Sequence, residues 1–257
     1  MDSKFRTALR NTRPLRVTNP ENVMLAFSGG PASRSLIHLF DVFHSLPPEV
    51  ASNKLQPKLY SEIHLCHIDE SCLNETQTHQ GDANNTSTSS TMEQAEAIAA
   101  RYGYRLHGIR IEDVYDPEWS DSGCFQALLA QILPYVDHAS CSTATRTDDP
   151  EHHHHHRRLS QIEKIQKLRG LLGSFTTLTA KELIVQHFRS SLLAQQAKRV
   201  NCSYLALGDS ATRVAIQIIS LTALGRGFSL PHETAAMSLW IKDVKIIRPL
   251  KDCLVKE

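Results

Sequence analysis

The segment best suited to chemistry is Ser-Gly-Gly-Pro-Ala-Ser at residues 28–33, directly after the apolar run 23–27. A strand, a glycine turn and a helical pattern in this order bring a helix N-terminus to the end of the strand. Outward-pointing backbone N–H groups and the helix dipole favour an anion there, and glycine lets a phosphate approach the main chain. An isolated Gly-Gly would indicate only a turn, so the prediction of a nucleotide- or phosphate-binding loop depends on further matches. Its candidate residues are Ser28, Gly29, Gly30 and Ser33.

A second segment of this kind is Leu-Gly-Asp-Ser-Ala-Thr-Arg-Val-Ala at residues 207–215. It follows the strand-like run 204–207 and begins a helical pattern with Val214, Ile218 and Leu221 on one side. The carboxyl ends of parallel strands meet at the edge where open α/β sheets bind ligands, so we expect the two loops at the same edge. The candidate residues are Gly208, Asp209, Ser210, Thr212 and Arg213.

The elements that must position these loops alternate between strand-like and helix-like segments. This alternation predicts an α/β fold with a parallel sheet and helices on both faces. A capping box of Thr179 and Glu182 predicts the start of one helix, with Ile184, Phe188 and Leu192 on its buried face. We expect strands at 23–27, 63–68, 104–111, 204–207 and 244–247, and helices at 33–45, 95–102, 125–135, 179–200 and from 210 onward.

The 257 residues, 41% of them hydrophobic, suffice for one large core. We expect a basic N-terminal arm at 1–20 and a single α/β domain at 21–257. Insertions near 76–91 and 140–158 are too poor in apolar residues to offset the entropy of ordering, so they are predicted to be mobile. The second insertion contains five consecutive histidines, 152–156. Consecutive rings cannot all face one ion, and we predict no metal site.

The composition excludes several classes of function. A net charge of +1 gives no global field toward nucleic acid or an anionic membrane, so any RNA contact must be local. No apolar run approaches the length of a membrane span, and the first residues lack the apolar core of a signal peptide. The six cysteines are widely spaced and predicted to be free thiols in a reducing compartment. We therefore predict a cytoplasmic protein without a membrane partner.

Residues 20–255 resemble the cytoplasmic tRNA 2-thiolation protein 2 family. The resemblance rests on Ala-Phe-Ser-Gly-Gly-Pro at 26–31, Ile-Asp-Glu-Ser at 68–71, Gly-Asp-Ser-Ala-Thr-Arg at 208–213, Ala-Leu-Gly-Arg-Gly at 223–227, Leu-Pro at 230–231 and Arg-Pro-Leu at 248–250. It implies a nucleotide alpha hydrolase (adenine nucleotide alpha hydrolase-like) fold. It also implies a heterodimer with the catalytic tRNA 2-thiolation subunit 1, which exchanges oxygen for sulfur at C2 of the wobble uridine. The products implied are mcm5s2U in tRNA Lys, Glu and Gln, with sulfur from a thiocarboxylated ubiquitin-related modifier.

Active relatives carry residues that this chain lacks. Ala32 stands where they have a loop aspartate, Thr212 and Arg213 replace an acidic pair, and residues 174–177 read Ser-Phe-Thr-Thr where they have Cys-x-x-Cys. A methyl group cannot ligate a metal. We therefore predict a pyrophosphate-loop pseudoenzyme with no catalytic residues. ATP and zinc are candidate cofactors of the complex, but no residue of this chain supports either.

Two alternatives stay open beside this prediction. One is an active adenylating enzyme of the pyrophosphate-loop class with unusual residues, and the other is a plain nucleotide-binding module. Basic side chains in the arm and near the sheet edge could contact tRNA phosphates, although the arm could equally be a solvated face. The candidates are Arg6, Arg10, Arg13, Arg226 and Arg248. Family members commonly begin with paired Cys-x-x-Cys motifs and continue beyond Arg-Pro-Leu, so we interpret the chain as a short form or a fragment.

Overall fold

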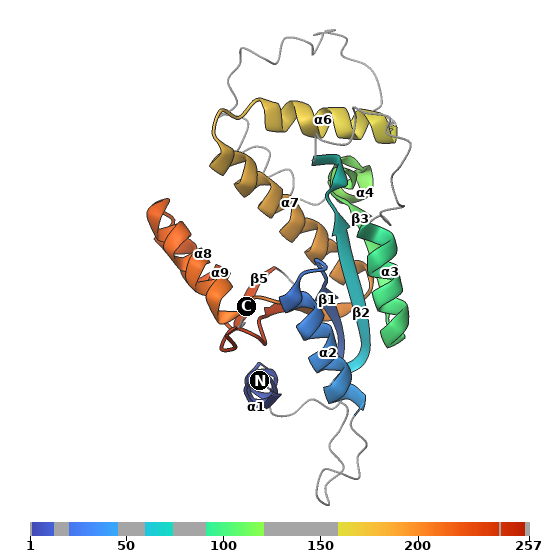
Figure 1. Ribbon diagram of the computed structural model, residues 1–257. Coiled ribbons are helices and arrows are strands. Elements are labelled where there is room, and N and C mark those ends of the chain that lie inside the picture. Colours follow the sequence, from blue (N-terminus) through green and yellow to red (C-terminus); the bar gives the residue numbers. More distant parts are fainter. Residues whose placement is uncertain are drawn as a thin grey trace, which may run out of the picture. The chain divides into compact units, whose positions relative to one another are not determined.

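A computed structural model describes residues 2–12, 21–45, 60–73, 91–120, 159–241 and 243–254 (Figure 1). The chain divides into two compact units. The first comprises Met1–Ile68, Asn85–Gly108 and Leu193–Glu257, and the second comprises Asp69–Asn84 and Ile109–Leu192. The predicted insertions lie outside the described residues except for Thr91, and so do the histidine run and the predicted helix 125–135.

Six strands form one sheet in the order β3-β2-β1-β4-β6-β5. Strand β1 pairs in parallel with β2 and with β4, and β4 pairs in parallel with β6. The strands are β1 (Glu21–Ala26), β2 (Tyr60–Asp69), β3 (Arg105–Arg110), β4 (Cys202–Ala206), β5 (Met237–Ile241) and β6 (Val244–Ile247). The five predicted strands and the mostly parallel α/β arrangement are therefore confirmed.

The edge strand β5 departs from the prediction, because it runs antiparallel to β6. The two strands are separated by only two residues, and so short a connection can form a hairpin but not the crossover that a parallel pair requires. Asp243 in this turn has a φ of 72°, in the left-handed region that such tight hairpins use.

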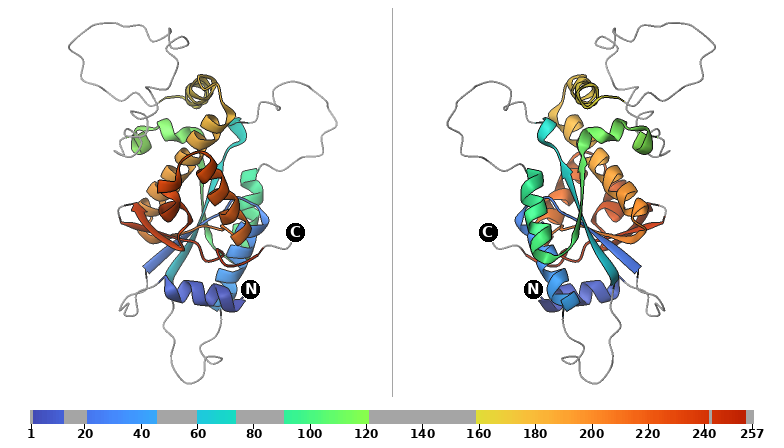
Figure 2. Two further views of the ribbon diagram at one scale, coloured as in Figure 1. Left: turned by 90° about the vertical axis from the view of Figure 1, so that its left-hand side faces the viewer. Right: turned by 90° about the vertical axis from the view of Figure 1, so that its right-hand side faces the viewer.

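Helices of the first unit pack on the sheet. They are α1 (Asp2–Asn11), α2 (Pro31–Ser45), α3 (Thr91–Tyr102), α8 (Ala211–Ala223) and α9 (Leu230–Thr234), with a short 3-10 helix η7 at Gly227–Ser229. Figure 2 shows α1 across the end of α2 and α3 alongside the strands. The residues expected to form a basic arm thus include the helix α1, whose Phe5 and Leu9 are fully buried.

Both faces of the sheet are buried. Successive side chains of a strand point to opposite faces, and Val23, Met24 and Leu25 of β1 are all fully buried. One face, with Val23 and Leu25, joins α1, α2 and α3 in a single hydrophobic core, in which Phe5 meets Phe40 edge to face at 5.4 Å. Such continuous burial is typical of a parallel sheet.

The second unit contains α4 (Pro117–Ser120), α6 (Gln161–Gly173), the 3-10 helices η2 (Ser71–Leu73) and η4 (Ile111–Tyr115), and most of α7 (Leu178–Arg199). Lys164 of α6 donates to Asp116 at 2.7 Å and to Asp113 at 3.1 Å. Arg189 of α7 contacts Glu70 with two nitrogens, at 2.5 and 2.8 Å. Among the described helices, none is long and apolar enough to cross a membrane.

The start of α7 differs from the predicted capping box. Thr179 lies inside the helix, and the Thr177 hydroxyl accepts from the backbone N–H of Ala180 at 3.3 Å, as an N-cap does. The predicted buried face is confirmed, since Ile184, Phe188 and Leu192 are all buried. In α8, Val214 and Leu221 are buried, but Ile218 is 40% exposed.

Candidate functional site

The first unit has one place where the strand order reverses. Strand β1 has β2 on one side and β4 on the other, and the helices α2 and α8 begin just after β1 and β4. In open α/β sheets, the crevice beyond the carboxyl ends of two such strands is the usual binding position for a ligand. Both candidate loops lie at this switch point.

The first loop is built by a glycine turn and a proline. Gly29 has a φ of 79°, which favours glycine, and Pro31 occupies the first turn of α2, where its missing N–H costs nothing. The Ser33 hydroxyl is buried and donates to the Gly30 carbonyl at 2.9 Å. The Ser28 hydroxyl lies 3.4 Å from the Ser33 hydroxyl. The loop is therefore closed internally by its own serines.

The two loops touch through Gly208. A Cβ atom at this position would lie 3.2 Å from the backbone N and Cα of Ser33 and 3.3 Å from the carbonyl carbon of Ala32. Because these distances to backbone atoms are so short, a side chain at Gly208 would require one of the two loops to shift. Gly208 is thus the residue that allows the loops after β1 and β4 to pack closely.

Charged groups follow Gly208 at the start of α8. The hydroxyl of Ser210 caps this helix by accepting from the backbone N–H of Arg213 at 3.4 Å. Asp209 accepts from Nε of Arg248 at 3.0 Å, and Nε of Arg213 lies 3.8 Å from its other oxygen. The Arg248 side chain is buried, whereas that of Arg213 is 73% exposed. Arg213 thus exposes its guanidinium to solvent in the first turn of α8.

His67, near the carboxyl end of β2, was not among the predicted site residues. Its Nδ1 lies 2.8 Å from the Phe27 carbonyl oxygen, at the end of β1. A carbonyl only accepts, so Nδ1 carries the proton and, in the neutral ring, Nε2 is an acceptor. Nε2 is buried without a hydrogen-bond partner. The one sequence signal for His67 was its place as a polar residue near the end of an apolar strand.

A metal centre does not fit the described residues. Ala32 offers a methyl group at the start of α2, and Thr212 and Arg213 supply no carboxylate at the start of α8. Residues 174–177, in the second unit, hold no thiol. In the part of the chain that the structure describes, no three His, Cys, Asp or Glu side chains gather around a common point. The structure therefore provides no ligands for magnesium or for an iron–sulfur cluster there.

The thiols of Cys66, Cys72 and Cys202 are unsuited to sulfur chemistry. Burial raises the pKa of Cys66 to about 12, and it does the same for Cys202. The pKa of Cys72 is also raised to about 12, first by burial and then by its hydrogen bond to Glu112. Because the thiolate is the reactive form, these thiols are poor nucleophiles near neutral pH.

The candidate RNA-binding arginines have varied surroundings. Arg226 lies 3.4 Å from Glu233, and Arg248 also donates to the Ala235 carbonyl at 3.0 Å, so both hold the local fold together. Arg6 lies over the ring of Phe43 at 6.0 Å, and Arg10 is exposed. Arg13 lies outside the described residues.

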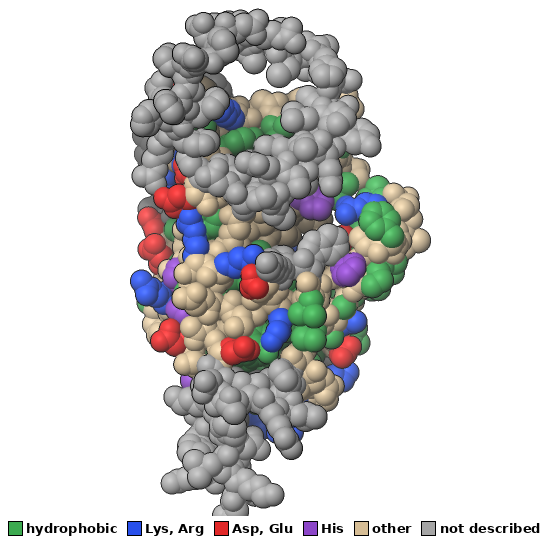
Figure 3. Space-filling view, turned by 180° about the vertical axis from the view of Figure 1, so that it is seen from behind, with side chains coloured by type: hydrophobic (Ala, Val, Ile, Leu, Met, Phe, Trp, Pro, Cys, Tyr) green, Lys and Arg blue, Asp and Glu red, His purple; other side chains and the backbone are tan. Residues whose placement is uncertain are grey.

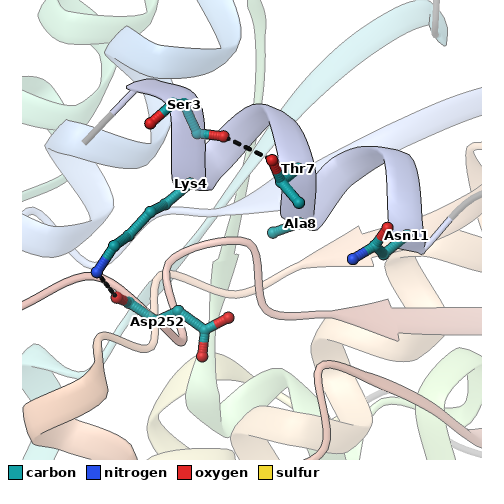
Figure 4. A pocket seen from close by; sticks show the side chains of 6 residues that line it. All are labelled: Ser3, Lys4, Thr7, Ala8, Asn11 and Asp252. Carbon is teal, nitrogen blue, oxygen red and sulfur yellow. Dashed lines mark hydrogen bonds between the residues drawn. The ribbon is translucent and has the colours of Figure 1, made fainter.

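Lys4 of α1 forms a hydrogen bond with the C-terminal segment. Its amine donates to the Asp252 carbonyl at 3.3 Å in a pocket that Ser3, Thr7 and Asn11 also line (Figure 4). This bond ties α1 to the C-terminal segment of the first unit.

A mostly parallel sheet with two touching loops at its switch point defines an open α/β fold. No family model matches the chain. Across its length, however, it is similar to proteins named cytoplasmic tRNA 2-thiolation protein 2. It is 26% identical to those of Bos taurus and Homo sapiens over 99% of this chain and 50% of theirs. It is 25% identical to that of Dictyostelium discoideum over 92% of this chain and 35% of the relative.

The chain therefore spans between a third and a half of the length of the curated relatives it matches. Among solved structures, it is similar to the U34-tRNA thiolase NcsA from Methanococcus maripaludis with its [4Fe-4S] cluster. That similarity has a TM-score of 0.49 and 13% identity, and it covers 98% of this chain and 58% of the other.

Proposed function

We propose that this chain is a non-catalytic subunit of a complex that 2-thiolates the wobble uridine of cytoplasmic tRNAs. The observation that carries the proposal is the similarity across 92–99% of the chain to proteins named for this modification. The switch-point loops support the non-catalytic part of the proposal, because they lack the acidic groups that the chemistry needs.

The chemistry explains why those groups matter. Thiolation at C2 requires the uridine oxygen to become a leaving group, and transfer of an adenylyl group to it places charge on phosphate oxygens. Metal ions and pre-positioned charges normally stabilise that charge, at a cost of several orders of magnitude in rate when they are missing. With Ala32, Thr212 and Arg213 in the matching positions, this chain lacks the carboxylates that would hold a metal ion against that charge.

The residues that remain at the two loops are suited to binding an anion. The starts of α2 and α8 lie at the same switch point of the sheet, and the exposed guanidinium of Arg213 lies in the first turn of α8. Such an arrangement favours an anion that is held without being transferred. We propose that a tRNA phosphate is that anion, and that Arg226 and Arg10 contribute further contacts.

The partners follow from the same proposal. A subunit without adenylating groups requires a catalytic subunit, here the tRNA 2-thiolation subunit 1, and a sulfur donor, here the thiocarboxylated ubiquitin-related modifier. In this account the present chain stabilises the catalytic subunit and completes its tRNA-binding surface. The complex acts in the cytoplasm, the location in the names of the similar proteins.

The test is a reconstitution with purified components. Each subunit alone and the co-expressed pair would be supplied with ATP, the sulfur carrier and a wobble-uridine tRNA, and 2-thiouridine would be measured by mass spectrometry. We expect product only from the pair. Thiolation or ATP-dependent adenylation by this chain alone would show that Ala32, Thr212 and Arg213 do not disable it.

A further inference from the structure

Ser160 carries an exposed hydroxyl that the proposed function does not use. It directly precedes α6, which begins at Gln161 (Figure 1). Residues 157–160 read Arg-Arg-Leu-Ser, and no other serine or threonine of the chain has arginines both two and three positions before it. Two positive charges at this distance from a hydroxyl form a charge pattern of the kind by which protein kinases select their substrates.

The backbone at Ser160 has the conformation that such an enzyme requires. A kinase holds its substrate segment in extended form, so that the hydroxyl lies in line with the phosphoryl group to be transferred. Ser160 has a φ of −67° and a ψ of 157°, which is extended backbone, and it is the N-cap residue of α6 rather than part of its first turn. The hydroxyl is therefore presented at the end of the helix and not along its side.

Ser229 provides a comparison within the same chain. It too has an arginine three positions before it, Arg226. However, Ser229 is only 1% exposed, and its hydroxyl donates to the Arg226 carbonyl at 3.0 Å. A buried hydroxyl cannot enter the active site of another protein. Ser160 is therefore the accessible one of the two serines that have an arginine at this spacing.

The charge pattern before Ser160 is local. On the face of the molecule shown in Figure 3, acidic and basic side chains are interspersed among the described residues. The net charge of the whole chain is only +1, so no overall field draws a charge-selective enzyme to it. Selection by a kinase therefore depends on the residues next to the serine.

We propose that Ser160 is a phosphorylation site for a protein kinase that selects arginine two and three positions before the acceptor. In the reaction, Oγ of Ser160 forms a bond to the γ-phosphorus of ATP. The bond from that phosphorus to the bridging oxygen breaks, ADP leaves with the electron pair, and the hydroxyl proton passes to solvent. The product carries a charge of about −1.5 to −2 at pH 7.

Phosphorylation changes the cap of α6. The Ser160 hydroxyl donates to Oε2 of Glu163 at 2.9 Å, and the Ser160 backbone N–H donates to the same oxygen at 2.7 Å. A phosphate ester has no hydroxyl proton to donate, and its charge repels the carboxylate. The backbone N–H groups and the dipole at the start of α6 stabilise the phosphate in place of the carboxylate. Glu163 can then pair with Lys167, four positions further along, which lines the same surface hollow.

The test is a kinase assay on the purified full chain. The chain is incubated with ATP and the catalytic subunit of a cyclic-AMP-dependent protein kinase, and phosphopeptides are mapped by mass spectrometry. We expect phosphate on Ser160. Arg157→Gln with Arg158→Gln should lower kcat/KM at least about tenfold. The control, Arg101→Gln with Arg105→Gln, removes the same charge at exposed positions and should leave kcat/KM unchanged. Circular dichroism verifies that both double variants fold.

A second measurement tests the change of cap. Phosphorus NMR gives the second pKa of the phosphoserine, which is about 6 in a free chain. Because the N–H groups at the start of α6 favour the dianion, we expect a lower pKa in the folded chain than in urea. An equal pKa in both conditions would contradict the change of cap.

The phosphorylation site itself has its own contrary outcomes. A chain without phosphate on Ser160, phosphate on Ser229 to the same extent, or equal kcat/KM for the two double variants would overturn the proposal. Neither measurement contains tRNA or a catalytic subunit, so these outcomes are independent of the role in tRNA thiolation.

Discussion

Nε of Arg248 lies 3.0 Å from Oδ2 of Asp209, joining the start of the C-terminal segment to the loop that precedes α8. The arginine side chain is 7% exposed and that of the aspartate 21%. Nη1 of Arg248 also donates to the carbonyl of Ala235, just before β5. The loop that we propose to hold a phosphate is therefore fixed by a long-range ion pair.

Replacing Arg248 should consequently destabilise the fold. Arg248→Met leaves the Asp209 carboxylate without its buried partner, and breaking such a pair costs about 3 kcal/mol in free energy of unfolding. Arg213→Met removes an exposed contact to the same carboxylate and should cost less than about 0.5 kcal/mol. Urea denaturation of both variants checks the difference. Equal midpoints for the two would show that the buried pair does not hold the loop.

A side chain at Gly208 should destabilise the fold. The added methyl group of Gly208→Ala would press on the Ser33 backbone, and overpacking of this kind costs about 1–3 kcal/mol. The matched control is Gly170→Ala in α6, where a Cβ meets nothing within 4 Å. Because alanine favours a helix over glycine, that variant should be as stable as the unaltered chain or more so. A stable Gly208→Ala protein would refute the close contact of the two loops.

Stability should fall in mild acid because of two histidines on neighbouring strands. Nε2 of His107 lies 3.3 Å from Nδ1 of buried His64. Burial lowers the pKa of His107, and electrostatic interactions with His64 and Arg105 lower it further. The exposed Glu62 lies 3.3 Å from the far nitrogen of His64, although that nitrogen makes no hydrogen bond.

The direction of this pH dependence follows from where the proton binds. The unfolded chain binds a proton at His107 near its ordinary pKa of 6.5, whereas the folded chain resists it. The contribution of His107 to the free energy of unfolding is therefore fully present above pH 6.5 and declines as the pH falls below it. Urea midpoints between about pH 5 and 8 should show the decline, and His107→Gln should flatten it. A decline that persists unchanged in His107→Gln would assign it to other groups.

tRNA binding should depend on Arg213, at the start of α8, and on Arg226, just beyond its end. In the complex with the catalytic subunit, changing Arg213 and Arg226 together to alanine should weaken tRNA binding and reduce its salt dependence by about two phosphate contacts. The control is Arg101→Ala, an exposed arginine on α3. Unchanged affinity at both low and high salt would remove these residues from the proposed RNA surface. Folding of the double variant must be verified, since Arg226 also contacts Glu233.

Much of the fold could be predicted because its elements follow local patterns. The strands that carry the loops are short apolar runs, and the glycine turn and the serine cap of α8 lie next to them in sequence. By contrast, β5 was not predicted, since its place depends on a hairpin with β6. Helix α6 was also missed, although Ser160 and Glu163 form a capping box that the sequence displays.

The site was only partly accessible to prediction. The loop residues are recognisable from their type and spacing, but the pairing of Asp209 with Arg248 spans 39 positions and has no local signal. The same holds for His67, whose partner is a backbone carbonyl 40 positions away. Side chains that fix a site from a distance become visible only when the strands are placed side by side.

The central claim is that this chain is needed for 2-thiolation of wobble uridine but does not catalyse it. The most direct test is to delete its gene and quantify 2-thiouridine in purified tRNA Lys, Glu and Gln by mass spectrometry. We expect loss of the modification in the deletion strain and its restoration by the unaltered protein. Unchanged 2-thiouridine in the deletion strain would contradict the claim that the chain belongs to this reaction.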